Sequence, residues 1–224
     1  MMPQMTRITS LVLIAIGAGC ASNQGKGAAI GAGGGALAGA GIGALAGGEK
    51  GALIGAAIGA GTGAATGAVI GRYMDQQEKA LKEVKGAKVE RDGDKLIVRF
   101  DSAILFDTNK SALRAQSKQD LDKFAKVLTE YKETDLVVEG HTDNTGKKDH
   151  NRKLSGARAE AVIARLVGDG VARGRMAGKG LGDSEPIADN ATPAGRQQNR
   201  RVQVQIAANE ALRKKDAGAV AHGK

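Results

Sequence analysis

The sequence predicts an α/β (α+β) sandwich in its C-terminal half, with one mixed β-sheet packed against two main helices and a glycine-rich helical hairpin before it. Three observations predict this arrangement. Charged residues become frequent only from Arg72 onward, so a soluble domain begins near that residue. After Arg72, apolar residues recur in some segments with the two-residue period of a strand and in others with the three-to-four-residue period of a helix. Before it, glycine recurs at every fourth position.

The first residues have the pattern of a bacterial export signal. A short segment ends in Arg7, an apolar stretch runs from Ile8 to Ile16, and small residues lead to Cys20. The apolar stretch is too short to span a bilayer. Residues 1–19 are therefore expected to be a signal peptide.

Cys20, the single cysteine of the chain, cannot form an internal disulfide. Small residues directly before a cysteine resemble the bacterial lipobox, which implies lipidation of Cys20, although Gly17 stands where such boxes usually carry leucine. The alternative is an ordinary signal cleaved nearby. Ala21 and Ser22 lack the aspartate that marks inner-membrane retention in many such lipoproteins, so the resemblance implies an outer-membrane anchor.

A strict glycine repeat occupies residues 27–71. Twelve glycines recur at intervals of four from Gly27 to Gly71, and Glu49 and Lys50 separate two uncharged runs. As helices, the runs Gly27–Gly48 and Gly51–Gly71 would each be about 30 Å long, which matches a bilayer core. Each glycine costs a helix about 1 kcal/mol relative to alanine, so close backbone packing must compensate. The repeat predicts a membrane-associated helical hairpin.

Two other interpretations of the repeat stay open. A flexible Gly/Ala linker would only space the anchor from the domain. A linker needs many glycines but does not need them at a fixed spacing, so the strict repeat argues against it. An oligomer of the hairpins could form a membrane pore or an assembly scaffold, with the soluble domain as a tether. Thr62 and Thr66 are the only notably polar residues in the two runs, so a pore would have little to line it. A homo-oligomer remains open.

The elements of the soluble domain follow from apolar periodicity and turn residues. A helical connector over Tyr73–Lys85 leads to a hairpin around Asp92-Gly93-Asp94. The predicted elements are strands 88–91, 95–100 and 104–106, a helix over 111–131, a strand over 135–141, a helix over 154–167, and strands 175–179 and 202–207. A polar loop with Pro186 and Pro193 joins the last two strands. The order of elements indicates one mixed sheet covered by two helices.

The residues then become specific enough to resemble a family. The run His141-Thr142-Asp143-Asn144-Thr145-Gly146, followed by Asn151, Leu154-Ser155 and Arg158-Ala159, resembles the signature of OmpA-like peptidoglycan-binding domains. The segments Phe106-Asp107-Thr108-Asn109, Gly180-Leu181-Gly182 and Asn199-Arg200-Arg201-Val202 extend the resemblance over about 120 residues. The glycine repeat and Tyr73-Met74-Asp75 are similar to glycine-zipper outer-membrane lipoproteins that carry this domain.

The resemblance implies a non-catalytic pocket for the diaminopimelate of the peptidoglycan stem peptide. The free end of this residue carries an ammonium and a carboxylate. Asp143 would accept from the ammonium and Arg158 would clamp the carboxylate, helped by the start of the following helix. The family implies secondary roles for Asn109, Thr145, Asn151 and Arg200. Such a protein ties the outer membrane to the cell wall from the periplasm.

Other classes of function find little support in the sequence. The net charge of +9 forms no basic block, and there is no Trp and few other aromatic residues, which argues against a nucleic-acid partner. No serine lies in a GxSxG elbow, and Cys20 belongs to the export segment. His141, His150 and Asp143 make a poor metal cluster. We expect no enzyme, no cofactor and no metal.

The predicted organisation therefore has six parts. They are a signal peptide (1–19), a lipidated N-terminus and short linker (20–26), the glycine-zipper hairpin (27–71), a connector (72–87), an OmpA-like domain (88–207) and a flexible tail (208–224).

Overall fold

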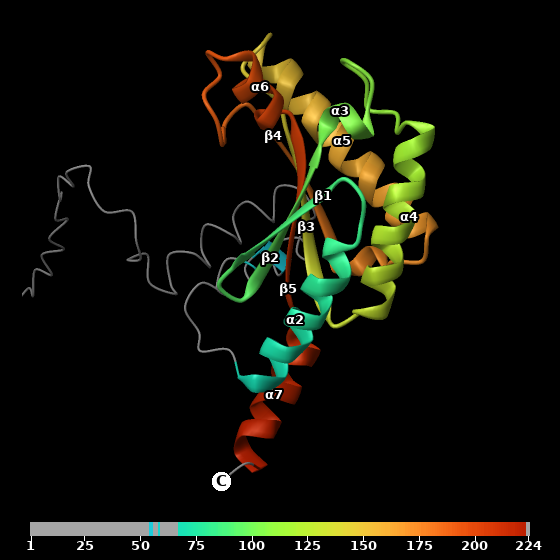
Figure 1. Cartoon of the computed structure of the whole chain (residues 1–224), viewed down its shortest axis with the longest axis vertical. Helices are drawn as coiled ribbons and strands as arrows, with labels where there is room; N and C mark the ends of the chain where they lie inside the picture. Colours follow the sequence, from blue (N-terminus) through green and yellow to red (C-terminus); the bar gives the residue numbers. More distant parts are fainter. Residues whose placement is uncertain (1–53, 56–57, 59–66, 223–224) are drawn as a thin grey trace, which may run out of the picture.

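A computed structural model describes residues 54, 55, 58 and 67–222 of the chain. One five-stranded sheet with the strand order β1-β2-β5-β3-β4 forms its centre (Figure 1). The elements are α2 (Ala68–Lys82), β1 (Ala87–Asp92), β2 (Lys95–Asp101), α3 (Ser102–Leu105), α4 (Ala115–Glu130), β3 (Thr134–His141), α5 (Lys148–Gly168), η1 (Arg173–Arg175), β4 (Met176–Gly182), α6 (Pro193–Asn199), β5 (Arg201–Ala208) and α7 (Glu210–His222). The signal peptide, Cys20 and most of the predicted hairpin lie outside the described residues.

The sheet is mixed, as predicted. Strands β1, β2, β5 and β3 pair antiparallel, and β4 pairs parallel to β3. The predicted hairpin is confirmed: Asp92 pairs with Lys95, and Gly93 between them takes a φ of 61°, a left-handed conformation that glycine adopts without strain. The central position of β5 places the last strand of the domain between β2 and β3.

Helices α2, α4 and α5 lie on one face of the sheet (Figure 1). Their apolar sides meet the alternate residues of the strands in one core. Phe100 of β2 and Phe124 of α4 pack edge to face, with ring centroids 5.3 Å apart, the geometry that aromatic quadrupoles favour. The α/β sandwich with two main helices, α4 and α5, is thus confirmed, and α2 adds a third.

Helix α5 approaches the sheet unusually closely because glycines line the contact. A Cβ atom on Gly140 of β3 would lie 2.0 Å from the carbonyl oxygen of Ser155, and one on Gly180 of β4 would lie 2.5 Å from the amide nitrogen of Gly156. Such distances are impossible for non-bonded atoms, so these positions require glycine. The close approach fixes α5 against the ends of β3 and β4.

Several predicted elements differ in the structure. The strand predicted over 104–106 is wrong, because the helical turn α3 replaces it and the Asp101 carboxylate accepts from the Ala103 N–H at its start. Helix α4 begins at Ala115, later than predicted. Helix α5 begins at Lys148, six residues before the predicted start at Leu154. The short helix α6 lies inside the predicted polar loop.

The last residues form a helix and not the predicted flexible tail. Helix α7 spans Glu210–His222, and its Asp216 carboxylate accepts from the N–H groups of Gly67, Val69 and Ile70 at 3.0 to 3.2 Å. These are the unpaired donors of the first turn of α2, which has no side-chain cap of its own. Because α2 begins at Ala68, it starts inside the predicted hairpin range and continues through the predicted connector.

Replacing Asp216 by Ala should therefore destabilise the domain. Loss of a helix cap costs about 1–2 kcal/mol, and the buried donors of α2 would keep no partner from α7. Urea unfolding followed by circular dichroism measures the change. Glu210→Ala is the matched control on the same helix, because Glu210 is exposed and, among the described residues, forms an ion pair only with Lys214 one turn away, so it should leave the midpoint nearly unchanged. Equal midpoints for Asp216→Ala and the parent would contradict the cap.

No helix within residues 67–222 combines the length and apolar character needed to cross a bilayer.

Candidate functional site

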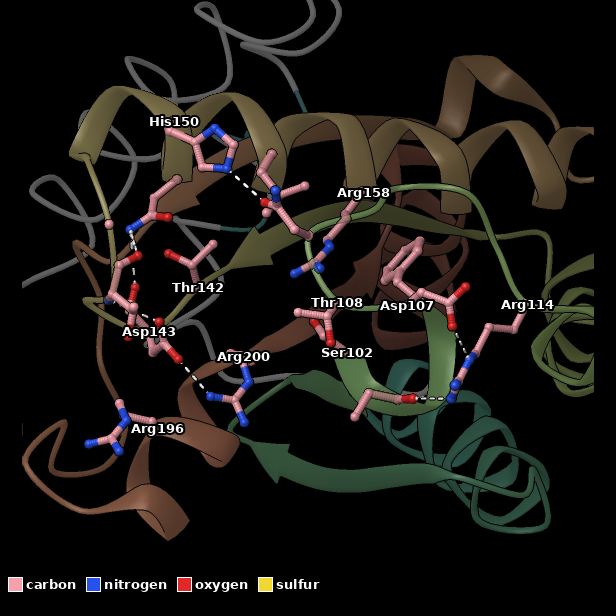
Figure 2. Close-up of a pocket in the computed structure, with 17 residues that line it drawn as sticks. Ser102, Asp107, Thr108, Arg114, Thr142, Asp143, His150, Arg158, Arg196 and Arg200 are labelled. Carbon is pink, nitrogen blue, oxygen red and sulfur yellow. Dashed lines mark hydrogen bonds and ion pairs between the residues drawn. The ribbon is translucent and has the colours of Figure 1, made fainter.

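A pocket of about 1000 Å³ opens where the ends of β3 and β5, the loop after α3, the start of α5 and helix α6 meet (Figure 2). It is lined by Ser102, Ala103, Phe106, Asp107, Thr108, Asn109, Arg114, Thr142, Asp143, Thr145, Gly146, His150, Asn151, Leu154, Arg158, Arg196 and Arg200. All six predicted binding residues, Asp143, Arg158, Asn109, Thr145, Asn151 and Arg200, line this one pocket. The motif thus gathers residues separated by more than ninety positions in the chain.

Asp143 lies two residues after the end of β3 and is largely buried. One carboxylate oxygen accepts from the Thr145 N–H at 2.9 Å, and the other accepts from Nη1 of Arg200 at 2.6 Å. Burial acts to raise the pKa of this carboxyl, but the hydrogen bonds from Arg200 and Thr145 outweigh it, so the pKa is lowered. Asp143 is therefore a fixed negative charge in the pocket.

Arg158 supplies the positive charge from α5, and it is 5% exposed. Its Nε donates to the Lys110 carbonyl at 3.0 Å, and its guanidinium carbon lies 5.2 Å from the centre of the Phe106 ring. Burial and the nearby Arg200 lower the pKa of Arg158. Among the described residues, no hydrogen bond or ion pair engages its terminal nitrogens, which point into the pocket in Figure 2.

One part of the predicted geometry is wrong. The field of a helix N-terminus was expected to support the ligand carboxylate beside Arg158. Because α5 starts at Lys148, Arg158 lies ten residues inside the helix. The macrodipole acts mainly within the first turn, so it adds little at Arg158. The ring of Phe106 and the Lys110 carbonyl hold the guanidinium instead.

Two amide side chains hold the loops around the pocket. The Asn151 side chain donates to the carbonyls of Asp143 and Thr145 at 3.3 and 3.1 Å, and thereby ties the β3–α5 loop to α5. Asn109 takes a φ of 58°, a left-handed conformation that asparagine tolerates. Its side-chain oxygen is 2.8 Å from Nε2 of His150. These contacts indicate positioning roles for Asn109 and Asn151.

Several lining residues were not predicted from the sequence. Arg196 was assigned to a loop, but helix α6 presents it at the pocket edge, where it donates to the Asn190 and Ala191 carbonyls. Thr192, which caps α6 before Pro193, was a local signal for this helix. Ser102 and Thr142 each have a buried hydroxyl without a hydrogen-bond partner among the described residues. No sequence pattern distinguished Ser102, whereas Thr142 lies inside the motif but had no role assigned to it.

Arginine outnumbers acid in the lining. Arg114, Arg158, Arg196 and Arg200 face Asp107 and Asp143. Arg114 is paired with Asp107 at 2.9 Å, and Arg200 is paired with Asp143. The pocket therefore favours a ligand with at least one carboxylate. In the described part of the chain, no group of three His, Cys, Asp or Glu residues is arranged to hold a metal.

His141 precedes the site and is fully buried in β3, with neither ring nitrogen hydrogen-bonded to a described residue. Burial, together with Arg201 and Arg99, lowers its pKa from 6.5 to about 3. In the unfolded chain the ring takes up a proton below about pH 6.5, whereas in the folded domain it does not. The contribution of His141 to the free energy of unfolding is therefore largest above that pH, and it declines as the pH falls toward 3.

This difference predicts acid sensitivity. Each pH unit below 6.5 should cost about 1.4 kcal/mol, so the step from pH 7 to pH 5 should lower the free energy of unfolding by about 2 kcal/mol through His141 alone. Urea titrations of the parent and of His141→Asn at both pH values measure it. The variant should lose less stability over this step, whatever its stability at pH 7. Identical losses would contradict a neutral buried ring.

The fold and pocket define an OmpA family domain. The OmpA family model matches residues 105–200, and a YMGG-like Gly-zipper model matches residues 1–75. The domain belongs to the OmpA family and follows a glycine-zipper segment, which confirms the predicted resemblance. Neither family description names a catalytic activity.

Individual relatives match part of this chain. The chain is 40% identical over 140 residues to the probable lipoprotein YiaD of Escherichia coli, with 61% of this chain and 64% of YiaD covered. It is 41% identical over 109 residues to the outer-membrane lipoprotein YfiB of Pseudomonas aeruginosa, with 49% of this chain and 65% of YfiB covered. The chain thus spans less than two thirds of either relative.

A solved structure agrees with the fold. The cell wall anchor of the T6SS from Pseudomonas aeruginosa superposes with a TM-score of 0.52 at 30% identity, over 62% of this chain and 97% of that one.

Proposed function

We propose that the pocket binds the diaminopimelate of peptidoglycan without catalysis and that the protein thereby ties the outer membrane to the cell wall. The observation that carries the proposal is the buried guanidinium of Arg158, whose terminal nitrogens have no partner among the described residues. A buried cation is costly unless it is paired. A carboxylate ligand that enters the pocket supplies that partner.

The zwitterionic end of diaminopimelate fits the two charges. Its carboxylate binds the guanidinium of Arg158 as a bidentate pair. Its ammonium approaches Asp143, whose carboxylate already accepts from Arg200 and Thr145. Arg200 is 39% exposed at its side chain, so it shares the Asp143 carboxylate or turns toward solvent when the ammonium arrives. No covalent bond forms or breaks.

The names of the relatives support the location. YiaD is a probable lipoprotein, YfiB is an outer-membrane lipoprotein, and the solved relative is a cell wall anchor. We infer that Cys20 carries the lipid in the outer membrane and that the domain faces the periplasm. Mass spectrometry of the mature N-terminus tests the lipid directly, because an acylated Cys20 differs in mass from an unmodified one.

A single pocket of this kind binds weakly. Two or three charged hydrogen bonds contribute about 1.5–3 kcal/mol each before the costs of ordering the ligand, which places the dissociation constant at about 1 mM. Firm attachment then depends on many copies that engage one wall.

Competition tests the proposed ligand. Full-length protein in detergent should co-sediment with purified diaminopimelate-containing sacculi, and free meso-diaminopimelate at several millimolar, above the expected constant of about 1 mM, should release it. Cadaverine is the matched control because it keeps the carbon chain and both ammonium groups of diaminopimelate but has no carboxylate, so it should release much less. Equal release by both compounds would contradict a carboxylate clamp at Arg158.

A further inference from the structure

The second face of the sheet, away from α4 and α5, has an apolar end. Side chains alternate between the faces of a strand, so Val137 of β3 points away from its neighbours Leu136 and Val138, which belong to the main core. Val137 pairs in register with Ala177 of β4. Val137, Ala177 and Ala207 are each 1% exposed, so something covers this end of the second face.

The described residues that cover it come from the glycine repeat. Ile54 and Ile58 form one cluster with Val137, Ala177 and Ala207, and they are themselves 5% and 4% exposed. The two isoleucines are four positions apart, the spacing that places side chains on one face of a helix. In Figure 1 the short cyan segments at these positions lie beside the sheet, on the side away from α4.

A polar network bounds the patch on the same face. Glu139 follows Val137 by two positions and accepts from the side chains of Gln203 and Gln205 at 3.1 and 2.8 Å. Lys179 lies 3.6 Å from the same carboxylate. The charged network therefore bounds the apolar end of this face on the side toward the end of β3, and a bulky apolar residue placed over the network would leave these charges without water.

Chain length permits the contact within one molecule. Ile58 precedes Gly67 by nine residues, and Gly67 is held by Asp216 of α7. Nine residues reach about 30 Å when extended, the length of a small domain. The connection is thus long enough to bring Ile58 from the base of α2 to the second face of the same sheet.

We propose that the apolar end of the second face is the docking surface for the chain's own segment around Ile54 and Ile58. This docking holds the second glycine-rich run against the domain and replaces the bilayer crossing predicted for that run. The two isoleucines are among the few large apolar residues of the run, so their burial on the sheet removes much of what would favour lipid.

Crosslinking in membranes tests the docking. Full-length variants that pair Ile54→Cys or Ile58→Cys with Ala177→Cys or Ala207→Cys are expressed in cells, oxidised in isolated outer membranes and digested for mass spectrometry. At least one pair should close within one chain. Glu90→Cys with Ile97→Cys, opposite each other in the hairpin, is the positive control, and single-cysteine variants reveal any disulfide with Cys20.

The matched negative control joins Ile54→Cys to Val167→Cys, which lies 39% exposed on α5, on the helical side of the sheet. This pair should not close. Closure of the hairpin control without closure of any of the four docking pairs in membranes would overturn the proposal, as would equal closure with Val167→Cys.

Thiol labelling provides a second measurement on the same surface. Ala177→Cys should react slowly with a membrane-impermeant maleimide, and the added changes Ile54→Asp and Ile58→Asp should speed labelling by about tenfold or more, since the thiol then no longer depends on local opening. Val220→Asp, at a 61% exposed position of α7, should leave the rate unchanged. An unchanged rate in the double aspartate variant would also overturn the proposal.

Discussion

Replacing Arg158 by Lys should reduce binding to sacculi by roughly 100-fold or more. The lysine ammonium keeps the charge but cannot form the two parallel hydrogen bonds of a guanidinium or stack on Phe106 as the guanidinium does. Charged hydrogen bonds contribute about 1.5–3 kcal/mol each, so the loss of two costs about 3 kcal/mol or more. Co-sedimentation over a range of sacculus concentrations measures the change.

Asp143→Asn should weaken binding by a comparable factor. The amide keeps the size of the side chain and one oxygen to accept from Thr145, but it removes the negative charge that faces the ammonium and Arg200. Arg165→Gln is the matched control for the Arg158 variant. Arg165 also lies on α5, but it pairs with Asp122 and Asp169 outside the pocket. Wild-type sedimentation by both Arg158→Lys and Asp143→Asn would show that the ligand binds elsewhere.

Replacing Gly140 by Ala should strongly destabilise the domain. The new Cβ would lie 2.0 Å from the Ser155 carbonyl, which is backbone and cannot rotate away. Overpacking of this kind costs about 3 kcal/mol, or roughly 10 °C in melting temperature for a domain of this size. Because α5 carries Asn151 and Arg158, its displacement should also weaken wall binding.

Gly168→Ala is the matched control for this prediction. Gly168 is the last residue of α5, the helix that packs on Gly140, and a Cβ there would have no neighbour within 4 Å. Its melting temperature should equal or slightly exceed that of the parent, because alanine favours helix more than glycine does. Equal melting temperatures for Gly140→Ala and Gly168→Ala would contradict the close contact between α5 and β3.

Local patterns predicted most of the sheet and both covering helices. The alternation of apolar and polar residues around Asp92-Gly93-Asp94 lies within a few adjacent residues. The hairpin therefore forms where it was expected. Ile104 and Leu105 have the same apolar character but belong to the helical turn α3, which Asp101 caps, and only Phe106 makes a β-bridge, with Leu113. Apolar periodicity alone does not distinguish these outcomes in so short a segment.

Helix α7 illustrates a limit of a different kind. Its sequence from Glu210 shows little division into polar and apolar sides, and it was predicted to be flexible. In the structure its Asp216 contacts Gly67, which is 149 positions away. Only the folded chain brings these residues together, so no local pattern could reveal the pairing.

The candidate site was easier to predict than its physical basis. The OmpA-like motif identified six residues that do meet in one pocket. It did not show that the ring of Phe106 and the Lys110 carbonyl, and not the start of a helix, hold Arg158. A motif fixes residue types and spacing, whereas support from neighbouring side chains depends on where α5 begins.

The pocket and the base of α2 lie at opposite ends of the molecule. In Figure 1, α3 and α6 are at one end of the sheet, whereas the start of α2 and helix α7 are at the other, and β3 and β5 run between them. If the pocket holds the wall as proposed, a pull between membrane and wall enters where the docked segment around Ile54 and Ile58, together with Gly67, meets the domain, and it leaves through the pocket along these strands. Such a force acts parallel to the strands and loads the hydrogen bonds between β2, β5 and β3 in shear. These bonds then share the load and do not break one after another. On the proposed function, this orientation suits the domain to bear mechanical tension.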